Sequence, residues 1–325
     1  MITRRSGLAA LASGLTLATR PVLAQEHYPD HPPRLVVPYG AGSATDLIAR
    51  QLAGKVGDLL GQRPVVENRA GAGGIVGAEF VAHGPPDGYT MLFAGSQTHA
   101  ININLYQRLP YDPVADFTPI ARVASQPLVL VVHPNVPAHS VAELIALAKA
   151  RPGQLNYASS GIGTSAHLSG STLRSQAGID IVHVPYSGGG QLFTDLLSGA
   201  TSMMFYPYQA LRPHVEAGKL RVLASTGATR PAWLANVPTM VEAGFPDFVL
   251  TAWFGVFGPA GMAAARVETV SDAIRRAVAD PEILAAFTVS GTDALYAPPA
   301  EFKTFIASEI QRYAKVVADS GAKVE

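Results

Sequence analysis

Two short loops, rich in Gly, Ser, Ala and Thr, contain most of the residues of this sequence that could bind or transform a ligand. The first is "PYGAGSATD", Pro38 to Asp46, and the second is "SSGIGTSAH", Ser159 to His167. Each follows an apolar run and precedes a helical pattern, so each predicts a strand, a loop and a helix start. A helix start leaves unpaired backbone N–H groups at the positive end of the helix dipole. Both loops therefore predict a site for a negatively charged group.

The first loop has the residue types of a helix N-terminus. Ser43 stands at an N-cap position, and Asp46, three residues later, resembles a capping box. Starting a helix is enough to explain the Asp46 carboxylate. Four neighbouring positions carry little or no side chain, which lets a ligand approach the main chain: Gly40, Ala41, Gly42 and Ala44.

The second loop also fits the G-x-G-x-x-A pattern of dinucleotide-binding proteins, from Gly161 to Ala166. A dinucleotide site needs an acidic residue at the end of the following strand, about 20 residues on. Asp180 instead precedes the next strand, "IVHVPY". The pattern therefore favours an anion site over a nucleotide site.

Two such loops, one in each half of a molecule, predict one ligand shared between them. A carboxylate could accept ~4 charge-assisted hydrogen bonds, each contributing about 1.5–3 kcal/mol, or ~6–12 kcal/mol in total. Association costs at least ~4 kcal/mol. Micromolar affinity is therefore attainable without an arginine salt bridge, because fixed backbone dipoles can hold a charge.

Composition excludes several other classes of function. Among 325 residues there are 24 Lys and Arg and 24 Asp and Glu, so the net charge of zero argues against nucleic acid as the main partner. The chain has no Cys, which excludes disulfides, thiolate metal sites and thiol nucleophiles. None of its nine His occurs at a metal-ligand spacing such as H-E-x-x-H. We expect neither a metal nor a cofactor.

The first 24 residues have the three-part pattern of an export signal. Arg4 and Arg5 form a charged start, an Ala- and Leu-rich stretch follows, and "VLA" ending at Ala24 suits cleavage. The adjacent arginines suggest the twin-arginine route, but Gly7 stands where that signal has a bulky apolar residue, so the route stays open. An ordinary N-terminal helix is the alternative. We expect a protein in the periplasm.

The rest of the sequence alternates short apolar runs with helical patterns, which predicts an α/β fold with parallel sheets. Helices are expected over Asp46–Leu60 and Val141–Ala150, near Gln191, and twice near the C-terminus. No low-complexity linker separates domains, so domain boundaries should lie in strands that cross between lobes, near Pro127 and Thr251. This predicts one lobe from residues 25–126 with 252–325, and a second from residues 127–251.

Several stretches, in order along the chain, are similar to one family. Among them are "VVPYGAGSATDLIARQLA", "VVENRAGAGG", "LPYDP" and "HVPYSGGG". After the signal, nearly the whole chain resembles the Bug-type substrate-binding proteins of tripartite tricarboxylate transporters. The resemblance implies a type II periplasmic-binding-protein (Venus flytrap) fold, with two lobes of mostly parallel sheet flanked by helices and joined by two crossing strands. It also implies a monomeric receptor that closes on a small carboxylate and docks transiently with membrane transporter components.

The resemblance also implies which residues contact the ligand. The first loop would contribute Tyr39, Ala41, Ser43, Ala44 and Asp46, and the second would contribute Ser160, Gly163, Thr164 and His167. The others would be Ser96 and Gln97 from the first lobe, with Gly188, Gly189 and Tyr206 from the second. For His167, a structural hydrogen bond is an equal alternative to ligand contact.

Two departures from the family pattern bear on the ligand. Ser43 replaces the second of two adjacent glycines, and Tyr206 stands where many members have Asp. An acid at that position could balance a ligand amine, so its loss predicts a ligand without an α-amino group. Two alternative functions stay open. One is a periplasmic sensor subunit. The other is a hydrolase built on Ser and His, although no G-x-S-x-G motif occurs.

Overall fold

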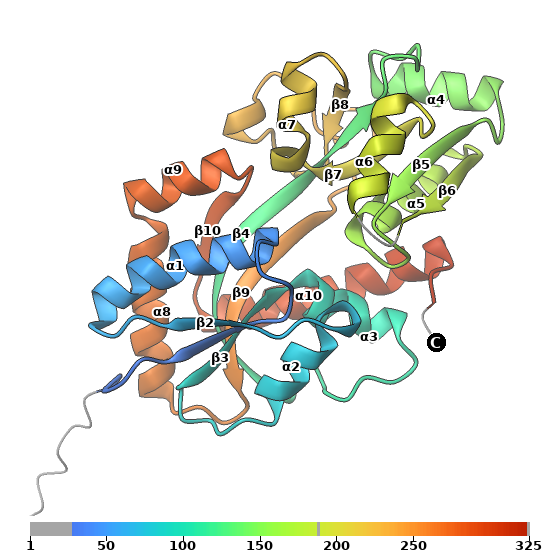
Figure 1. The fold of residues 1–325 in the computed structure, drawn as a ribbon. Coiled ribbons are helices and arrows are strands. Elements are labelled where there is room, and N and C mark those ends of the chain that lie inside the picture. The colour runs from blue at the N-terminus through green and yellow to red at the C-terminus, as the bar shows by residue number, and fades with distance from the viewer. Residues whose placement is uncertain (1–27, 187–188, 324–325) are drawn as a thin grey trace, which may run out of the picture.

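The computed structural model describes residues 28–186 and 189–323, so the predicted export signal and Gly188 lie outside the described residues. Its elements form two groups, with strands β4 (Phe117–Val132) and β9 (Thr251–Pro259) running between them (Figure 1). The green and yellow elements make up the middle group, and the blue, cyan, orange and red elements make up the terminal group.

The terminal group combines the two ends of the described chain. Its strands are β1 (Arg34–Val37), β2 (Val65–Asn68), β3 (Thr90–Gly95) and β10 (Asp293–Ala297). Its helices and turns are α1 (Ala44–Leu60), η1 (Ala72–Gly74), α2 (Ile75–Ala82), η2 (Gln97–Ile101), α3 (Asn102–Leu105), α8 (Ala264–Val278), α9 (Pro281–Val289) and α10 (Pro299–Ser320). Helix α10 packs on β4 and η2 and also reaches α5 of the middle group.

The middle group is built from the central part of the chain. Its strands are β5 (Leu155–Ser159), β6 (Ile181–Pro185), β7 (Met203–Pro207) and β8 (Arg221–Ser225). Its helices are α4 (Val141–Ala150), α5 (Ser165–Ala177), α6 (Gly189–Ser198), α7 (Tyr208–Glu216) and the short η3 (Ala232–Leu234).

The predicted α/β class is confirmed, and the sheet is mixed. Strands linked by helices pair in parallel, as β1 does with β2 and β3, and β5 with β6 and β7. All pairs made by the crossing strands are antiparallel. Along β4, Pro127 pairs with Thr251 of β9, and the next residue, Leu128, pairs with Pro207 of β7. The strand therefore passes from one group to the other at this step.

Helix α1 shows how the apolar pattern fixes the packing of these elements. Ile48, Leu52 and Val56 recur every four residues on one face and are buried, whereas Leu47 on another face is exposed. Each fully buried side chain of this kind contributes about 1.5–3 kcal/mol. Their burial fixes α1 against the sheet, and with it the orientation of its N-terminus.

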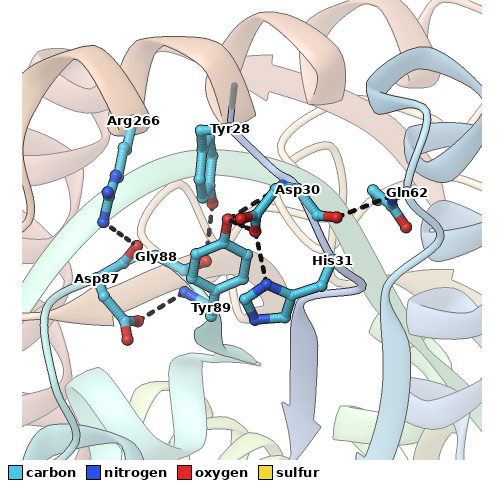
Figure 2. A network of polar contacts seen from close by, with 8 residues as sticks. All are labelled: Tyr28, Asp30, His31, Gln62, Asp87, Gly88, Tyr89 and Arg266. Carbon is cyan, nitrogen blue, oxygen red and sulfur yellow. Dashed lines mark hydrogen bonds and ion pairs between the residues drawn. The ribbon is translucent and has the colours of Figure 1, made fainter. Parts of the chain in front are cut away.

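The first described residues form hydrogen bonds and a ring contact with the end of the loop before β3 (Figure 2). The Tyr28 hydroxyl donates to the Gly88 carbonyl at 2.7 Å, and the Tyr89 hydroxyl donates to the Asp30 carboxylate at 2.6 Å. His31 stacks on the Tyr89 ring with centroids 3.8 Å apart. These contacts hold the chain beside β3 just before β1 enters the sheet.

Candidate functional site

A cavity of about 250 Å³ lies where β4 and β9 pass between the two groups. Seven of the residues predicted from sequence line it: Tyr39, Ala44, Ser96, Gln97, Ser160, Thr164 and Tyr206. None of the described residues that line it is charged. Any charge on a ligand here would meet backbone dipoles, hydroxyls and amides.

The N-terminus of α1, with two unpaired backbone N–H groups, lies at this cavity. Ser43 is the N-cap, because its Oγ accepts from the Asp46 N–H at 3.3 Å and its carbonyl accepts from the Leu47 N–H at 3.0 Å. The N–H groups of Ala44 and Thr45 precede the first intrahelical bond, and no described residue accepts from them. Ala44 and Thr45 both line the cavity.

The N-terminus of α5 repeats this arrangement from the middle group. Thr164 is the N-cap, with its Oγ1 accepting from the His167 N–H at 3.4 Å and its carbonyl accepting from the Leu168 N–H at 2.9 Å. The N–H groups of Ser165 and Ala166 find no acceptor among the described residues, and both residues line the same cavity. Four unpaired donors at two positive dipole ends thus meet in one uncharged space.

The Asp46 carboxylate is turned away from this space. It accepts from the Gly42 N–H at 2.9 Å, from Arg50 Nε at 3.0 Å and from Asn68 Nδ2 at 2.8 Å. Burial acts to raise the pKa of Asp46, but these hydrogen bonds, with that from Arg50 the largest, hold the pKa below its usual value. Asp46 therefore braces the first loop, and neither it nor Ala41 or Ser43 lines the cavity.

His167 lies behind the second loop. Its Nδ1 accepts from the Gly163 N–H at 3.1 Å, and its Nε2 lies 3.4 Å from Ser171 Oγ. The ring stacks on His183 of β6, with centroids 4.1 Å apart. The structure therefore shows the structural hydrogen bond that sequence left as one alternative. Like Gly163, His167 is not among the lining residues.

This arrangement predicts a loss of stability in acid. Burial, followed by the charges of His183 and Arg174, lowers the pKa of His167 to about 4, whereas an unfolded His titrates near 6.5. The folded state prefers neutral His167. The contribution of this side chain to the free energy of unfolding is therefore complete above pH 6.5 and is lost as the pH falls toward 4. We expect the melting temperature of the wild type to fall more steeply over this range than that of His167→Gln.

Melting curves at several pH values between 7.5 and 4 would measure this difference. His83→Gln, which removes an exposed imidazole, is the control and should follow the wild type. Equal slopes for the wild type and His167→Gln would contradict the prediction.

Two tyrosines, one from each group, line the cavity: Tyr39 from the first loop and Tyr206 from strand β7. Burial raises the pKa of both Tyr39 and Tyr206, so both hydroxyls stay protonated at neutral pH and can donate hydrogen bonds. The Tyr206 ring lies edge-on to Phe193, with centroids 5.3 Å apart. Gln97, at the start of η2, donates through Nε2 to the Asn102 side chain at 2.8 Å.

The crossing strands also line the cavity, which was not predicted from sequence. They supply Gln126, Leu128, Ala252, Trp253 and Phe254. Gln126 Nε2 donates to the Ser290 carbonyl at 3.2 Å, and Trp253 is fully buried. Both strands were expected near this point, but which of their faces meets the ligand depends on the register of the sheet. Gly189 begins α6.

No cluster of three or more His, Cys, Asp or Glu side chains that could hold a metal ion occurs among the described residues. In the same part of the chain, no helix has both the length and the apolar character needed to cross a membrane.

Comparisons with known proteins agree on one family. Residues 48–322 match the family model described as the tripartite tricarboxylate transporter family receptor. The chain is 37% identical to BugT of Bordetella pertussis, over 96% of this chain and 97% of BugT. It also superposes on an R. palustris protein solved with adipate, with a TM-score of 0.81, 33% identity, and coverage of 91% of this chain and 100% of that one.

A third similar structure is MatC from Rhodopseudomonas palustris with bound malate, with a TM-score of 0.76 and 30% identity. It covers 89% of this chain and 100% of MatC. These matches extend over almost the whole of each protein, so they test the complete two-lobed fold and not one part of it. From its sequence and its fold, the chain belongs to the receptor family of the tripartite tricarboxylate transporters.

Proposed function

We propose that this protein is a periplasmic receptor that binds a small organic carboxylate in the cavity between its two groups and delivers it to a tripartite tricarboxylate-type transporter. The observation that carries the proposal is the meeting of four unpaired N–H groups, from the starts of α1 and α5, in a cavity without charged side chains. Ligands of relatives support it, since one similar structure contains adipate and another contains malate.

The two groups would act as lobes that close on the ligand. Their proposed division is residues 25–126 with 252–325 against residues 127–251, with the bending point where β4 changes partner after Pro127. A carboxylate that contacts Ala44 and Thr45 on one lobe and Ser165 and Ala166 on the other binds best when the lobes are close. Ligand binding therefore shifts the population toward the closed form, which would dock with the membrane components.

The lining predicts the chemical class of the ligand. Leu128, Trp253 and Phe254 offer apolar surface, and Tyr206 occupies the position at which an acid could have paired with an amine. An ammonium group in this cavity would lose hydration without gaining a counter-charge. We expect glutarate to bind at least about 100-fold more tightly than glutamate, which differs from it only by the amine, since an unpaired buried charge costs several kcal/mol.

Isothermal titration calorimetry with matched acids would check this preference, using glutarate against glutamate and succinate against aspartate. A thermal-shift screen with other mono- and dicarboxylates would then identify the best ligand. Tight binding of glutamate or aspartate that is weakened by Ser165→Pro, a change confined to this cavity, would overturn the proposed ligand class while leaving the receptor function in place.

A receptor should leave its ligand unchanged. The hydrolase alternative needs a serine in contact with a free base, but the His167 imidazole is engaged behind the loop through both ring nitrogens. Ser159 Oγ does lie 2.7 Å from His183 Nε2, but Ser159 is fully buried. After prolonged incubation with the best ligand, NMR spectra should contain no product signals. Any protein-dependent turnover would favour the hydrolase.

Export, assembly and partner need separate tests. The exported protein should begin at Gln25 by mass spectrometry, because cleavage is proposed after Ala24. It should behave as a monomer in light scattering. Loss of carboxylate uptake in a deletion strain would support a transporter partner, and normal uptake with a lost transcriptional response would support the sensor alternative.

A further inference from the structure

A second cavity, of about 540 Å³, lies on the opposite face of the crossing strands. Alternate residues of β4 separate the two spaces, because Gln126 and Leu128 line the cavity described above, whereas Ser125 and Pro127 line the second one. Thr251 of β9 also lines the second cavity. We call this space the rear cavity.

Arg122 lines the rear cavity, where the negative charge of Glu309 acts on it but forms no ion pair with it. Its guanidinium carbon lies 3.8 Å from the centroid of the Phe305 ring, and its buried Nε has no hydrogen-bond partner among the described residues. No described acid forms an ion pair with it. Burial lowers its pKa only to about 10, so it remains charged at neutral pH. A half-buried guanidinium in this condition favours a carboxylate, which it can bind through two parallel hydrogen bonds.

Glu309, the acid that could balance the charge of Arg122, already forms contacts with two other groups. Glu309, which is 5% exposed, accepts at Oε2 from Arg312 Nη2 at 2.6 Å and from Trp253 Nε1 at 2.9 Å. Arg312 and Glu309 thus neutralise each other on one wall of the rear cavity. Their pairing leaves the charge of Arg122 unbalanced.

Asp293 is the matching unbalanced anion. It lines the rear cavity, accepts a hydrogen bond from Trp233 Nε1 at 3.3 Å, and forms no ion pair with any described cation. Burial raises its pKa, as expected for a carboxylate that lacks a positive neighbour. In the antiparallel pairing of β10 with β4, Asp293 lies opposite Ser125, three residues or roughly 10 Å along the strand from Arg122. One unpaired cation and one unpaired anion therefore face a common space from different positions.

We propose that the rear cavity binds an amino acid as its zwitterion, with the ligand carboxylate on the Arg122 guanidinium and the ligand ammonium on the Asp293 carboxylate. This ligand balances both unpaired charges at once. A dicarboxylate would bring a second negative charge toward Asp293, and a simple amine would leave Arg122 unpaired. The hydroxyls of Ser125 and Thr251 offer further hydrogen bonds inside the same space. The site is distinct from the carboxylate cavity and does not depend on the function proposed for it.

Tryptophan fluorescence is well placed to detect binding in the rear cavity. The protein has two tryptophans, and each donates its indole N–H to an acid that lines this cavity, Trp233 to Asp293 and Trp253 to Glu309. We would titrate the full mature protein with each of the twenty protein amino acids and confirm any hit by calorimetry. We expect at least one amino acid to bind, and its deaminated analogue, such as propionate for alanine, to bind at least 10-fold more weakly.

Two substitutions assign the hit to the rear cavity. Arg122→Gln and Asp293→Asn should each weaken amino-acid binding at least 10-fold and leave glutarate binding unchanged, with melting temperatures showing that both variants are folded. Asp293→Asn keeps an oxygen that can accept from Trp233. The proposal is overturned if no amino acid binds, if both variants bind the hit like the wild type, or if the deaminated analogue binds equally well.

A further variant distinguishes amino-acid binding in the rear cavity from amino-acid binding in the carboxylate cavity. Ser165→Pro alters only the carboxylate cavity and should not change amino-acid affinity. If Ser165→Pro abolished amino-acid binding and Arg122→Gln did not, the amino acid would be entering the carboxylate cavity, and the rear-cavity proposal would fail.

Discussion

Replacing Ala44 with proline is expected to weaken carboxylate binding about 10- to 150-fold while leaving the fold intact, because it deletes one charge-assisted hydrogen bond of about 1.5–3 kcal/mol. Ala44 is the first helical residue of α1, a position at which proline is well tolerated because the missing N–H has no helical acceptor. Ser43 before it has φ −65° and ψ 159°, which is the conformation that proline requires of its predecessor.

The second helix start permits the same change. Ser165 is the first helical residue of α5, and Thr164 before it has φ −71° and ψ 156°. Ser165→Pro should therefore weaken binding to a similar extent. The double variant should combine both losses if the two N–H groups contact the ligand independently. Calorimetry with the best carboxylate would measure each effect.

Ala264→Pro is a matched control for the general effect of a proline at a helix start. Ala264 begins α8, is exposed, and follows Ala263 with φ −61° and ψ 132°. It lies outside the lining of the carboxylate cavity, so this variant should bind like the wild type. If both Ala44→Pro and Ser165→Pro also bound like the wild type, the backbone N–H groups would not be what holds the carboxylate.

Gly95→Ala is expected to destabilise the protein by about 3 kcal/mol or more, at the upper end of the cost of overpacking. Gly95 of β3 pairs with Phe254 of β9, and a Cβ at Gly95 would lie 1.6 Å from the Trp253 carbonyl oxygen. The obstacle is backbone in a strand that is paired on both sides, so no side chain can rotate to make room. The strands would have to separate, close to both the sheet centre and the cavity.

Urea denaturation would measure the loss, and the melting temperature should fall by roughly 6–12 °C at about 2–4 °C per kcal/mol. Gly190→Ala is the control, since Gly190 is a helical residue with nothing within 4 Å of its added Cβ. That change should be neutral or slightly stabilising, because alanine favours helix. A Gly95→Ala protein that melts at the wild-type temperature would contradict the packing argument.

Elements that follow local rules could be predicted from sequence. Helix Val141–Ala150 has the predicted bounds, because Ser140 caps it and its apolar residues recur at helical spacing. Ser43 is the N-cap, as predicted, and the first helix therefore begins at Ala44 and not at Asp46. Glu67 and Arg69, two residues apart, form an ion pair at 2.6 Å that also depends only on local sequence.

Helix α9 and strand β10 were not predicted from the sequence. This holds for helix α9 (Pro281–Val289) although the Asp280 cap and Pro281 form a start signal directly after α8. Strand β10 is short and pairs with β4 residues that are 168 or more positions away, so its existence depends on a partner that no local pattern reveals.

The sequence by itself determined the two helix starts and their unpaired N–H groups, because capping depends on residues within one turn of each other. Only the tertiary structure decided what those groups face. Asp46 is turned inward by Asn68, 22 residues away, and β4 presents Gln126 to one cavity and Ser125 to the other because of its register in the sheet. Whether a side chain can contact the ligand depends on the direction in which it points, and that direction is set by packing between segments that are distant in the chain.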